Sequence, residues 1–122
     1  MQKGSCLCGI VSYELKSDLK DITNCHCVMC QKQHGSAFAT FGNVPVDDLV
    51  YKTGKDKIST YMSSETVSRE FCGNCGSNLT WYDTNSHPEL IYLAVSSVDT
   101  KIIGTHVDNI YVESKVTWLG NS

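Results

Sequence analysis

The chain has 122 residues, 41% of them hydrophobic, which is enough for one compact domain with a small core over residues 1–122. Its formal net charge is -3 and it contains no run of like charges, so the composition does not favour a nucleic-acid partner. No apolar run is long enough to span a bilayer, and residues 1–4 are too short for a leader peptide. We therefore expect no membrane partner and a cytoplasmic location.

Short segments in which polar and apolar residues alternate recur between turns rich in Gly, Asn, Asp and Ser, which is typical of β-strands. In chain order the predicted strands are residues 10–15, 37–41, 58–62, 66–71, 78–82, 90–98 and 110–116. The near-continuous apolar run 90–98 indicates a central, buried strand. Residues 45–48, 52–57 and 83–88 are predicted loops or single turns.

One segment, residues 28–34, favours a short helix that ends at Gly35. No segment has apolar residues at helical spacing over three turns. The predicted fold class is therefore mainly β, a small single domain.

Seven cysteines are an odd number, and a reducing cytoplasm disfavours disulfides, so metal binding or redox chemistry is the better interpretation. Side chains alternate between the two faces of an extended chain, so the sulfurs of Cys6 and Cys8, two residues apart, point to the same side. The C-x-x-C-G segment from Cys72 through Cys75 has the form of a zinc knuckle. Two such pairs of thiolates predict one closed, structural zinc site with four cysteine ligands.

The remaining cysteines, Cys25, Cys27 and Cys30, predict a second zinc site. Cys25 and Cys27 would share one face of a strand, and the turn that follows would return Cys30 to them. Three protein ligands with one open position are typical of a catalytic zinc. Alternatively, a histidine closes the site; His34 fits this better than His26, which would point to the opposite face. A third interpretation is a redox-active dithiol of Cys27 and Cys30.

Three thiolates on a zinc dication leave a net charge of about -1, which weakens its Lewis acidity. Such a site suits the binding of an incoming thiol better than the activation of water, because a coordinated thiol is deprotonated. For proton transfer, His34 is the best candidate among nearby residues, since the ordinary pKa of histidine suits neutral pH. His34 can equally be a packing residue.

Four segments in order resemble the family of glutathione-dependent formaldehyde-activating enzymes, which includes the domain of centromere protein V. They are GSCLCGIVSYEL, NCHCVMCQKQHGSAFATF, YMSSETVSREFCGNCGSNL and HVDNIYVESKVTWL. The resemblance implies a fold of packed, bent antiparallel sheets, shared with methionine sulfoxide reductase B. It also implies the same division of zinc ligands, four structural and three catalytic.

The resemblance further implies a carbon–sulfur lyase activity like that of S-(hydroxymethyl)glutathione synthase, with a small thiol such as glutathione and formaldehyde or a related aldehyde as partners. Glutathione carries two carboxylates, so Lys32, Arg69 and Lys115 are candidate anchors. Each of them also has a plain structural interpretation. The alternative function is a non-enzymatic zinc module that binds a protein partner.

Overall fold

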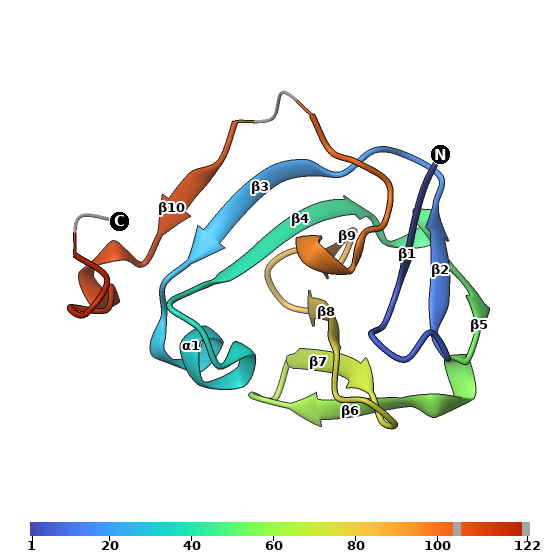
Figure 1. Cartoon of the computed structure of the whole chain (residues 1–122), viewed down its shortest axis with the longest axis horizontal. Helices are drawn as coiled ribbons and strands as arrows, with labels where there is room; N and C mark the ends of the chain where they lie inside the picture. Colours follow the sequence, from blue (N-terminus) through green and yellow to red (C-terminus); the bar gives the residue numbers. More distant parts are fainter. Residues whose placement is uncertain (104–105, 121–122) are drawn as a thin grey trace.

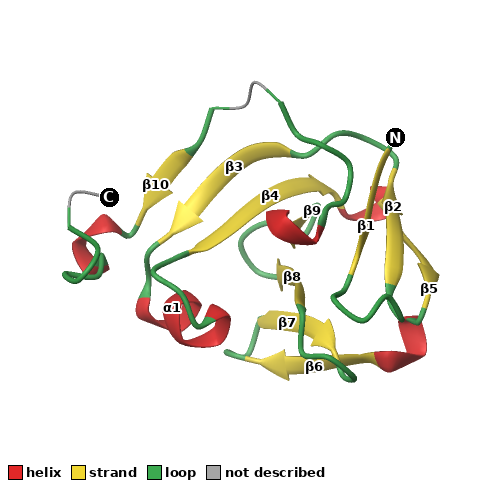
Figure 2. Ribbon diagram, in the orientation of Figure 1, coloured by secondary structure: helices red, strands yellow, loops and turns green. Residues whose placement is uncertain are grey.

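The structure, a computed structural model that describes residues 1–103 and 106–120, consists mostly of β-strands in two sheets (Figures 1 and 2). The smaller sheet has the strand order β1 (Gln2–Ser5), β2 (Ser12–Leu15), β5 (Leu49–Thr53). The larger has the order β10 (Asp108–Ile110), β3 (Lys20–Cys25), β4 (Ala39–Pro45), β9 (Leu90–Ala94), β8 (Asn78–Asp83), β7 (Val67–Cys72), β6 (Ile58–Met62). Neighbouring strands are antiparallel except β10 and β3, which are parallel. The predicted mainly β class is confirmed.

The hydrophobic core lies between the two sheets. Tyr13 and Leu15 on β2 are fully buried against Leu79 and Leu93 on β8 and β9. The hydroxyl of Tyr13 shares a 2.6 Å hydrogen bond with the Ser97 hydroxyl, and burial raises the pKa of Tyr13 to about 12. Strand β9 is the fourth of seven in the larger sheet, which confirms the prediction of a central, buried strand.

The single α-helix among the described residues, α1 (Val28–His34), begins and ends where the sequence predicts. Cys27 caps its N-terminus, because the Cys27 sulfur accepts a hydrogen bond from the backbone N–H of Cys30. Gly35 ends the helix with a φ of 58°, a left-handed conformation that glycine adopts without steric cost. The cap places Cys27 and Cys30 at the same end of the helix.

Two predicted strands are shorter than expected. The run 90–98 leaves the sheet after Ala94 and continues as the 3₁₀ turn η3 (Val95–Ser97), in which the Ser97 hydroxyl donates to the Ala94 carbonyl. The prediction of a strand at 110–116 is wrong except at Ile110, because β10 covers Asp108–Ile110 and η4 (Val112–Ser114) follows it. Local side-chain and backbone hydrogen bonds outweigh the strand propensity of these apolar runs.

Three strands, β1, β3 and β5, lie where the sequence predicts no strand. The first two are rich in polar residues, whereas β5 is mostly apolar but ends inside a segment that was predicted as a turn. The predicted turn at 45–48 is the 3₁₀ turn η1 (Val46–Asp48), whereas 52–57 divides into the end of β5 and η2 (Lys55–Lys57). The predicted loop 83–88 lies one residue later, at 84–89, because Asp83 is the last residue of β8. None of the described helices is long and apolar enough to cross a membrane.

Candidate metal centres and the adjoining cavity

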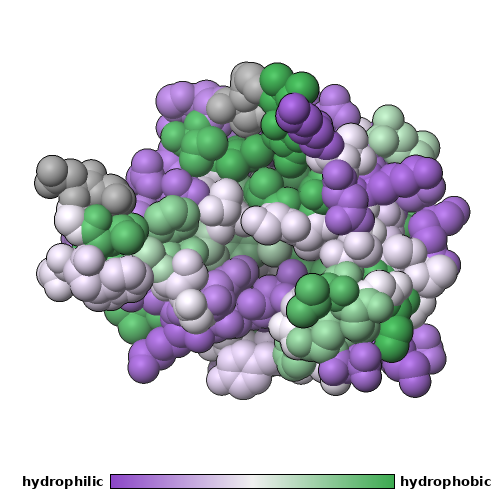
Figure 3. Space-filling model, in the orientation of Figure 1, coloured by the Kyte–Doolittle hydropathy of each residue, from purple (hydrophilic) through white to green (hydrophobic). Residues whose placement is uncertain are grey.

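Four cysteines from two distant parts of the chain meet in one cluster. The sulfurs of Cys6, Cys8, Cys72 and Cys75 all lie within 4.8 Å of one another. Cys6 and Cys8 lie in a tight turn after β1, closed by a 3.1 Å hydrogen bond from Gly9 N–H to the Cys6 carbonyl, so the expected extended conformation is wrong. Figure 3 shows hydrophobic residues over this turn, where Leu7 is exposed. The turn, instead of strand alternation, makes the two sulfurs converge.

Hydrogen-bond donors surround this four-cysteine cluster. The backbone N–H of Val11 donates to the Cys6 sulfur, and the Asn74 amide donates to the Cys8 sulfur, each over 3.3 Å. The Asn74 bond is the main cause of a lowered pKa at Cys8, and the hydroxyl of Ser77 lowers the pKa of Cys75 to about 5. Donors of this kind stabilise thiolates, the form in which cysteine binds metal. The cluster can therefore hold a metal ion, and its donor set suits zinc.

The other three cysteines form a second cluster, with the sulfurs of Cys25, Cys27 and Cys30 within 4.8 Å of one another. Cys25 is the last residue of β3, Cys27 caps α1, and Cys30 lies in the first turn of that helix. Cys25 and Cys27 thus do not share a strand face as the sequence suggests, although their sulfurs are only 3.5 Å apart. This cluster also can hold a metal ion.

Two thiols of the three-cysteine cluster have pKa values shifted in opposite directions. A hydrogen bond from Cys30 lowers the pKa of Cys25 to about 6, aided by the positive charge of Arg69. The pKa of Cys30 is raised, first by its hydrogen bond to Cys25 and then by burial. One thiolate therefore forms readily in the metal-free cluster, whereas a second has to form beside the first charge.

Neither candidate histidine is part of the three-cysteine cluster. His26 is only 2% exposed, packs against Phe38, and forms a 2.8 Å hydrogen bond between its Nε2 and the Asn109 side chain on β10. His34 packs edge-on against Phe41, and its buried Nε2 has no hydrogen-bond partner among the described residues. Burial, followed by the charge of Arg69, lowers the pKa of His34. His34 lines neither cavity described below, so its role in proton transfer stays a prediction.

The three-cysteine cluster opens on a cavity of about 710 Å³, here called the cysteine cavity. Trp81 and Tyr92 stand edge to face, with ring centroids 5.4 Å apart, and form part of its wall. Its other lining residues are Thr23, Met29, Phe41, Ser63, Ser64, Val67, Arg69, Asp83, Ser86, His87, Ile110 and Tyr111. A cavity of this size accommodates a small organic molecule next to the sulfurs.

Sequence reasoning missed most of this wall, above all Asp83, Tyr92 and Tyr111. One sequence pattern could have identified Asp83, because Trp81 and Asp83 are two residues apart on β8 and so share a face of the sheet. Tyr111 had no such signal. It reaches the cavity because β10 pairs with β3, a contact between segments about 85 residues apart in which Asp108 faces Thr23.

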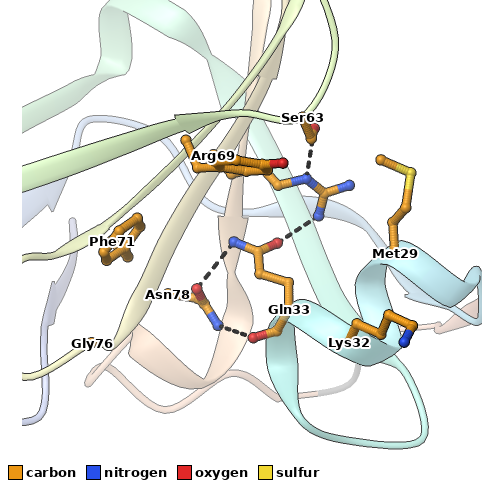
Figure 4. Close-up of a pocket in the computed structure, with 9 residues that line it drawn as sticks. Met29, Lys32, Gln33, Ser63, Arg69, Phe71, Gly76 and Asn78 are labelled. Atoms are coloured by element: carbon orange, nitrogen blue, oxygen red, sulfur yellow. Dashed lines mark hydrogen bonds between the residues drawn. The ribbon is translucent and has the colours of Figure 1, made fainter.

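Arg69 lies between the cysteines and a second opening, and it is only 5% exposed. Its Nε donates to the Ser63 hydroxyl over 3.0 Å, and its Nη1 donates to the Gln33 side-chain oxygen (Figure 4). The same Nη1 lies 3.8 Å from the Cys30 sulfur. Arg69 therefore connects β7 to helix α1 through contacts inside the protein, rather than presenting a free guanidinium to solvent.

We expect Arg69→Lys to lower the free energy of unfolding by about 1–3 kcal/mol, because one ammonium cannot replace both directed hydrogen bonds of the guanidinium and leaves a half-buried partner unpaired. Urea denaturation of the zinc-loaded protein measures this change. Lys55→Arg, at an exposed position in η2, serves as the control and should keep the wild-type midpoint. Equal midpoints for both variants would contradict the structural role of Arg69.

The two lysines that the sequence offers as carboxylate anchors differ in their position relative to the cavities. Lys32 lines the second opening, whereas Lys115 lines neither cavity. Of the candidate carboxylate anchors, Lys32 and Arg69 are therefore near the site.

A family model described as glutathione-dependent formaldehyde-activating enzyme matches residues 1–114. Proteins of Phaeosphaeria nodorum and Aspergillus terreus, both provisionally named glutathione-dependent formaldehyde-activating enzymes, are 33% identical over 78 residues and 28% identical over 93 residues. An uncharacterized lyase of Schizosaccharomyces pombe is 28% identical over 83 residues. These alignments cover 64%, 75% and 68% of this chain but 41%, 49% and 58% of those proteins, so the chain spans about half their length.

A crystal structure of a Rhodobacter sphaeroides protein has the same fold, with a TM-score of 0.71 and 25% sequence identity. The similarity covers 88% of this chain and 98% of that chain. The resemblance noted in the sequence is confirmed, because the family match includes all seven cysteines. The chain belongs to the family of glutathione-dependent formaldehyde-activating enzymes.

Proposed function

We propose that the protein is a zinc-dependent carbon–sulfur lyase that joins a small thiol, such as glutathione, to formaldehyde or a related small aldehyde. The observation that carries this proposal is the convergence of Cys25, Cys27 and Cys30 at the wall of the cysteine cavity. Sulfur ligands beside a cavity large enough for a thiol and an aldehyde suit thiol chemistry. The family membership and the lyase named among the relatives support the same reaction class.

Both cysteine clusters fit zinc by their donors, four sulfurs in one and three in the other. Cys6, Cys8, Cys72 and Cys75 would hold the structural ion, and Cys25, Cys27 and Cys30 the catalytic one. When bound, the catalytic zinc would supply a cation that keeps a substrate thiol deprotonated near neutral pH. We assign the whole chain, residues 1–122, to this one domain, and its reduced cysteines to a reducing compartment such as the cytoplasm.

In the proposed reaction the substrate thiol gives up its proton, and its sulfur attacks the carbonyl carbon of the aldehyde. A carbon–sulfur bond forms, the π electron pair of the carbonyl moves to oxygen, and the oxygen takes up one proton, so charge and atoms balance. The reverse sequence is the lyase direction. Phe41, Trp81 and Tyr92 would exclude bulk water from the reacting atoms, and His34 remains the proposed acid-base residue.

The test is to add zinc-loaded protein to glutathione and formaldehyde and to follow formation of the S-hydroxymethyl adduct by NMR exchange. We expect the exchange rate to rise in proportion to protein concentration, after subtraction of the spontaneous reaction. Heat-denatured protein with the same zinc content controls for free metal. If neither glutathione nor cysteamine nor cysteine reacts faster than without protein, the enzymatic proposal is wrong and a non-enzymatic zinc module becomes the better account.

A further inference from the structure

Arg69 is a charged side chain that lies inside the protein. It is the only arginine among the ten Lys and Arg residues of the chain, and only 5% of its surface is exposed. A guanidinium does not lose its proton in proteins, so burial cannot make this side chain neutral. Because a charge is costly to remove from water, buried arginines are almost always paired with an anion. The partner of this charge is therefore worth identifying.

No carboxylate pairs with Arg69. Among the described residues no carboxylate oxygen lies within 4.0 Å of its guanidinium, because the ion pairs found there involve Lys3, Lys52, His87 and His106. Glu70 follows Arg69 in β7, so its side chain lies on the opposite face of the sheet. There its carboxylate accepts hydrogen bonds from the hydroxyl groups of Tyr51 and Thr80, over 3.0 Å and 2.8 Å.

Two neutral side chains hold the guanidinium in place. They are Ser63, which accepts from Nε, and Gln33, which accepts from Nη1 (Figure 4). Gln33 is itself fixed, because its amide donates to the Asn78 side-chain oxygen over 3.1 Å. These acceptors orient the guanidinium but bring no negative charge. Arg69 is thus a positioned cation without a carboxylate counter-ion among the described residues.

The three-cysteine cluster can supply the missing negative charge. The Nη1 atom of Arg69 lies 3.8 Å from the sulfur of Cys30, a residue that is only 3% exposed. Arg69 also lines the cysteine cavity, as all three cysteines of the cluster do. Three thiolates on a zinc dication carry a net charge of about -1, which one guanidinium balances. Because both charges are buried, little water screens their attraction.

We propose that Arg69 is the fixed counter-ion of the three-cysteine zinc centre and that its charge sets how tightly this centre holds zinc. The inference rests on the proposed function, which assigns the catalytic zinc to these cysteines. Arg69 acts through Cys30 and the charge of the centre, so it is a positioning residue. The four-cysteine cluster has its own donors, the Val11 N–H and the Asn74 amide, and its zinc should not depend on Arg69.

The first test measures zinc affinity by competition with a chromophoric chelator, with the four-cysteine site as internal reference. Arg69→Gln should weaken zinc binding at the three-cysteine site by about 10–100-fold, the usual effect of losing a group that supports a metal ligand. Arg69→Lys keeps the charge and should retain an affinity close to wild type, although it loses directed hydrogen bonds and stability. A purely structural role would give both variants the same zinc affinity.

A second variant, Gln33→Glu, tests the proposal whether or not Arg69→Gln folds. It places a carboxylate beside the guanidinium with little change in size, and glutamate favours a helix as much as glutamine does. The new carboxylate competes with the thiolates for Arg69, so zinc binding at the three-cysteine site should weaken by about tenfold. If Arg69 only joined β7 to α1, the new ion pair would hold it more firmly and leave zinc affinity unchanged.

Lys55→Gln is the matched control, because it makes the same change in net charge as Arg69→Gln and Gln33→Glu at an exposed position in η2. It should keep the wild-type zinc affinity at both sites, since water and salt screen an exposed charge.

The two proposals fail separately. If thiol and formaldehyde react faster with protein but Arg69→Gln or Gln33→Glu folds and keeps the wild-type zinc affinity, the counter-ion assignment is overturned and the lyase proposal stands. Equal losses of affinity in Arg69→Lys and Arg69→Gln would overturn it as well. If no thiol reacts while Gln33→Glu weakens zinc binding at the three-cysteine site and Lys55→Gln does not, the lyase proposal is overturned and the counter-ion assignment is supported.

Discussion

Cys72→Ser is expected to leave the chain unfolded at room temperature, with fewer than two zinc ions bound. Cys72 ends β7 and is 0% exposed, and its cluster joins the turn after β1 to a loop more than 60 residues later. Loss of one thiolate opens this closed site. In zinc-finger peptides a structural zinc contributes about 10–16 kcal/mol. That is as large as the whole stability of a small domain, about 5–15 kcal/mol, so the fold should depend on this ion.

Far-UV circular dichroism and zinc analysis of the purified variant measure the two effects. A chelator added to the wild-type protein should produce the same loss of structure. Cys27→Ser, which alters the other cluster, is the control and should keep a cooperative thermal transition. A folded Cys72→Ser variant with wild-type thermal stability would show that the core alone holds the two sheets together.

The four-cysteine cluster was predictable because its ligands come in two close pairs, and each pair is brought together by local structure. The reasoning about that local structure was nevertheless partly wrong. Cys6 and Cys8 converge through a turn at Gly9 and not through an extended strand, and both conformations bring the sulfurs to one side. Spacing restricts which cysteines can share a metal more strongly than it determines the backbone between them.

For the three-cysteine cluster, too, the spacing indicated which cysteines lie together but not the backbone conformation between them. Sequence reasoning placed Cys27 on a strand, whereas the chain leaves β3 at Cys25 and uses Cys27 as the helix cap. A cysteine is an unusual cap, and the common capping residues give a sequence signal that is absent here. The predicted bounds of α1 were nonetheless correct, because Gly35 marks its end.

The cavity wall could not be derived from local patterns, because distant pairings assemble it. Ile110 and Tyr111 reach the cysteines only because β10 lies beside β3, where the Ile110 carbonyl accepts from the His26 N–H over 3.0 Å. Gln31 adds a second attachment by donating to the Ser114 carbonyl. The residues 110–116 were expected to form a strand, and their actual path depends on these contacts with a segment about 85 residues earlier.

Cys27→Ser is expected to lower the proposed lyase activity by more than about 100-fold while the protein keeps its fold and its structural zinc. Loss of a group that only supports a metal ligand typically costs 10–100-fold, and loss of a ligand should cost more. The fold should persist because serine is among the best N-terminal caps of a helix, and its oxygen can replace the Cys27 sulfur as acceptor for Cys30 N–H. Metal analysis should find one firmly bound zinc instead of two.

Cys27→Ala separates the two roles of this side chain. It should match Cys27→Ser in activity and zinc content, yet be less stable to urea by about 1 kcal/mol, because alanine cannot cap helix α1. If Cys27→Ser retains wild-type turnover and two zinc ions, the third sulfur is not a ligand and the three-cysteine site is wrong. If Cys27→Ser and Cys27→Ala are equally stable, the sulfur acts through the metal alone and its hydrogen bond to Cys30 adds nothing to the helix.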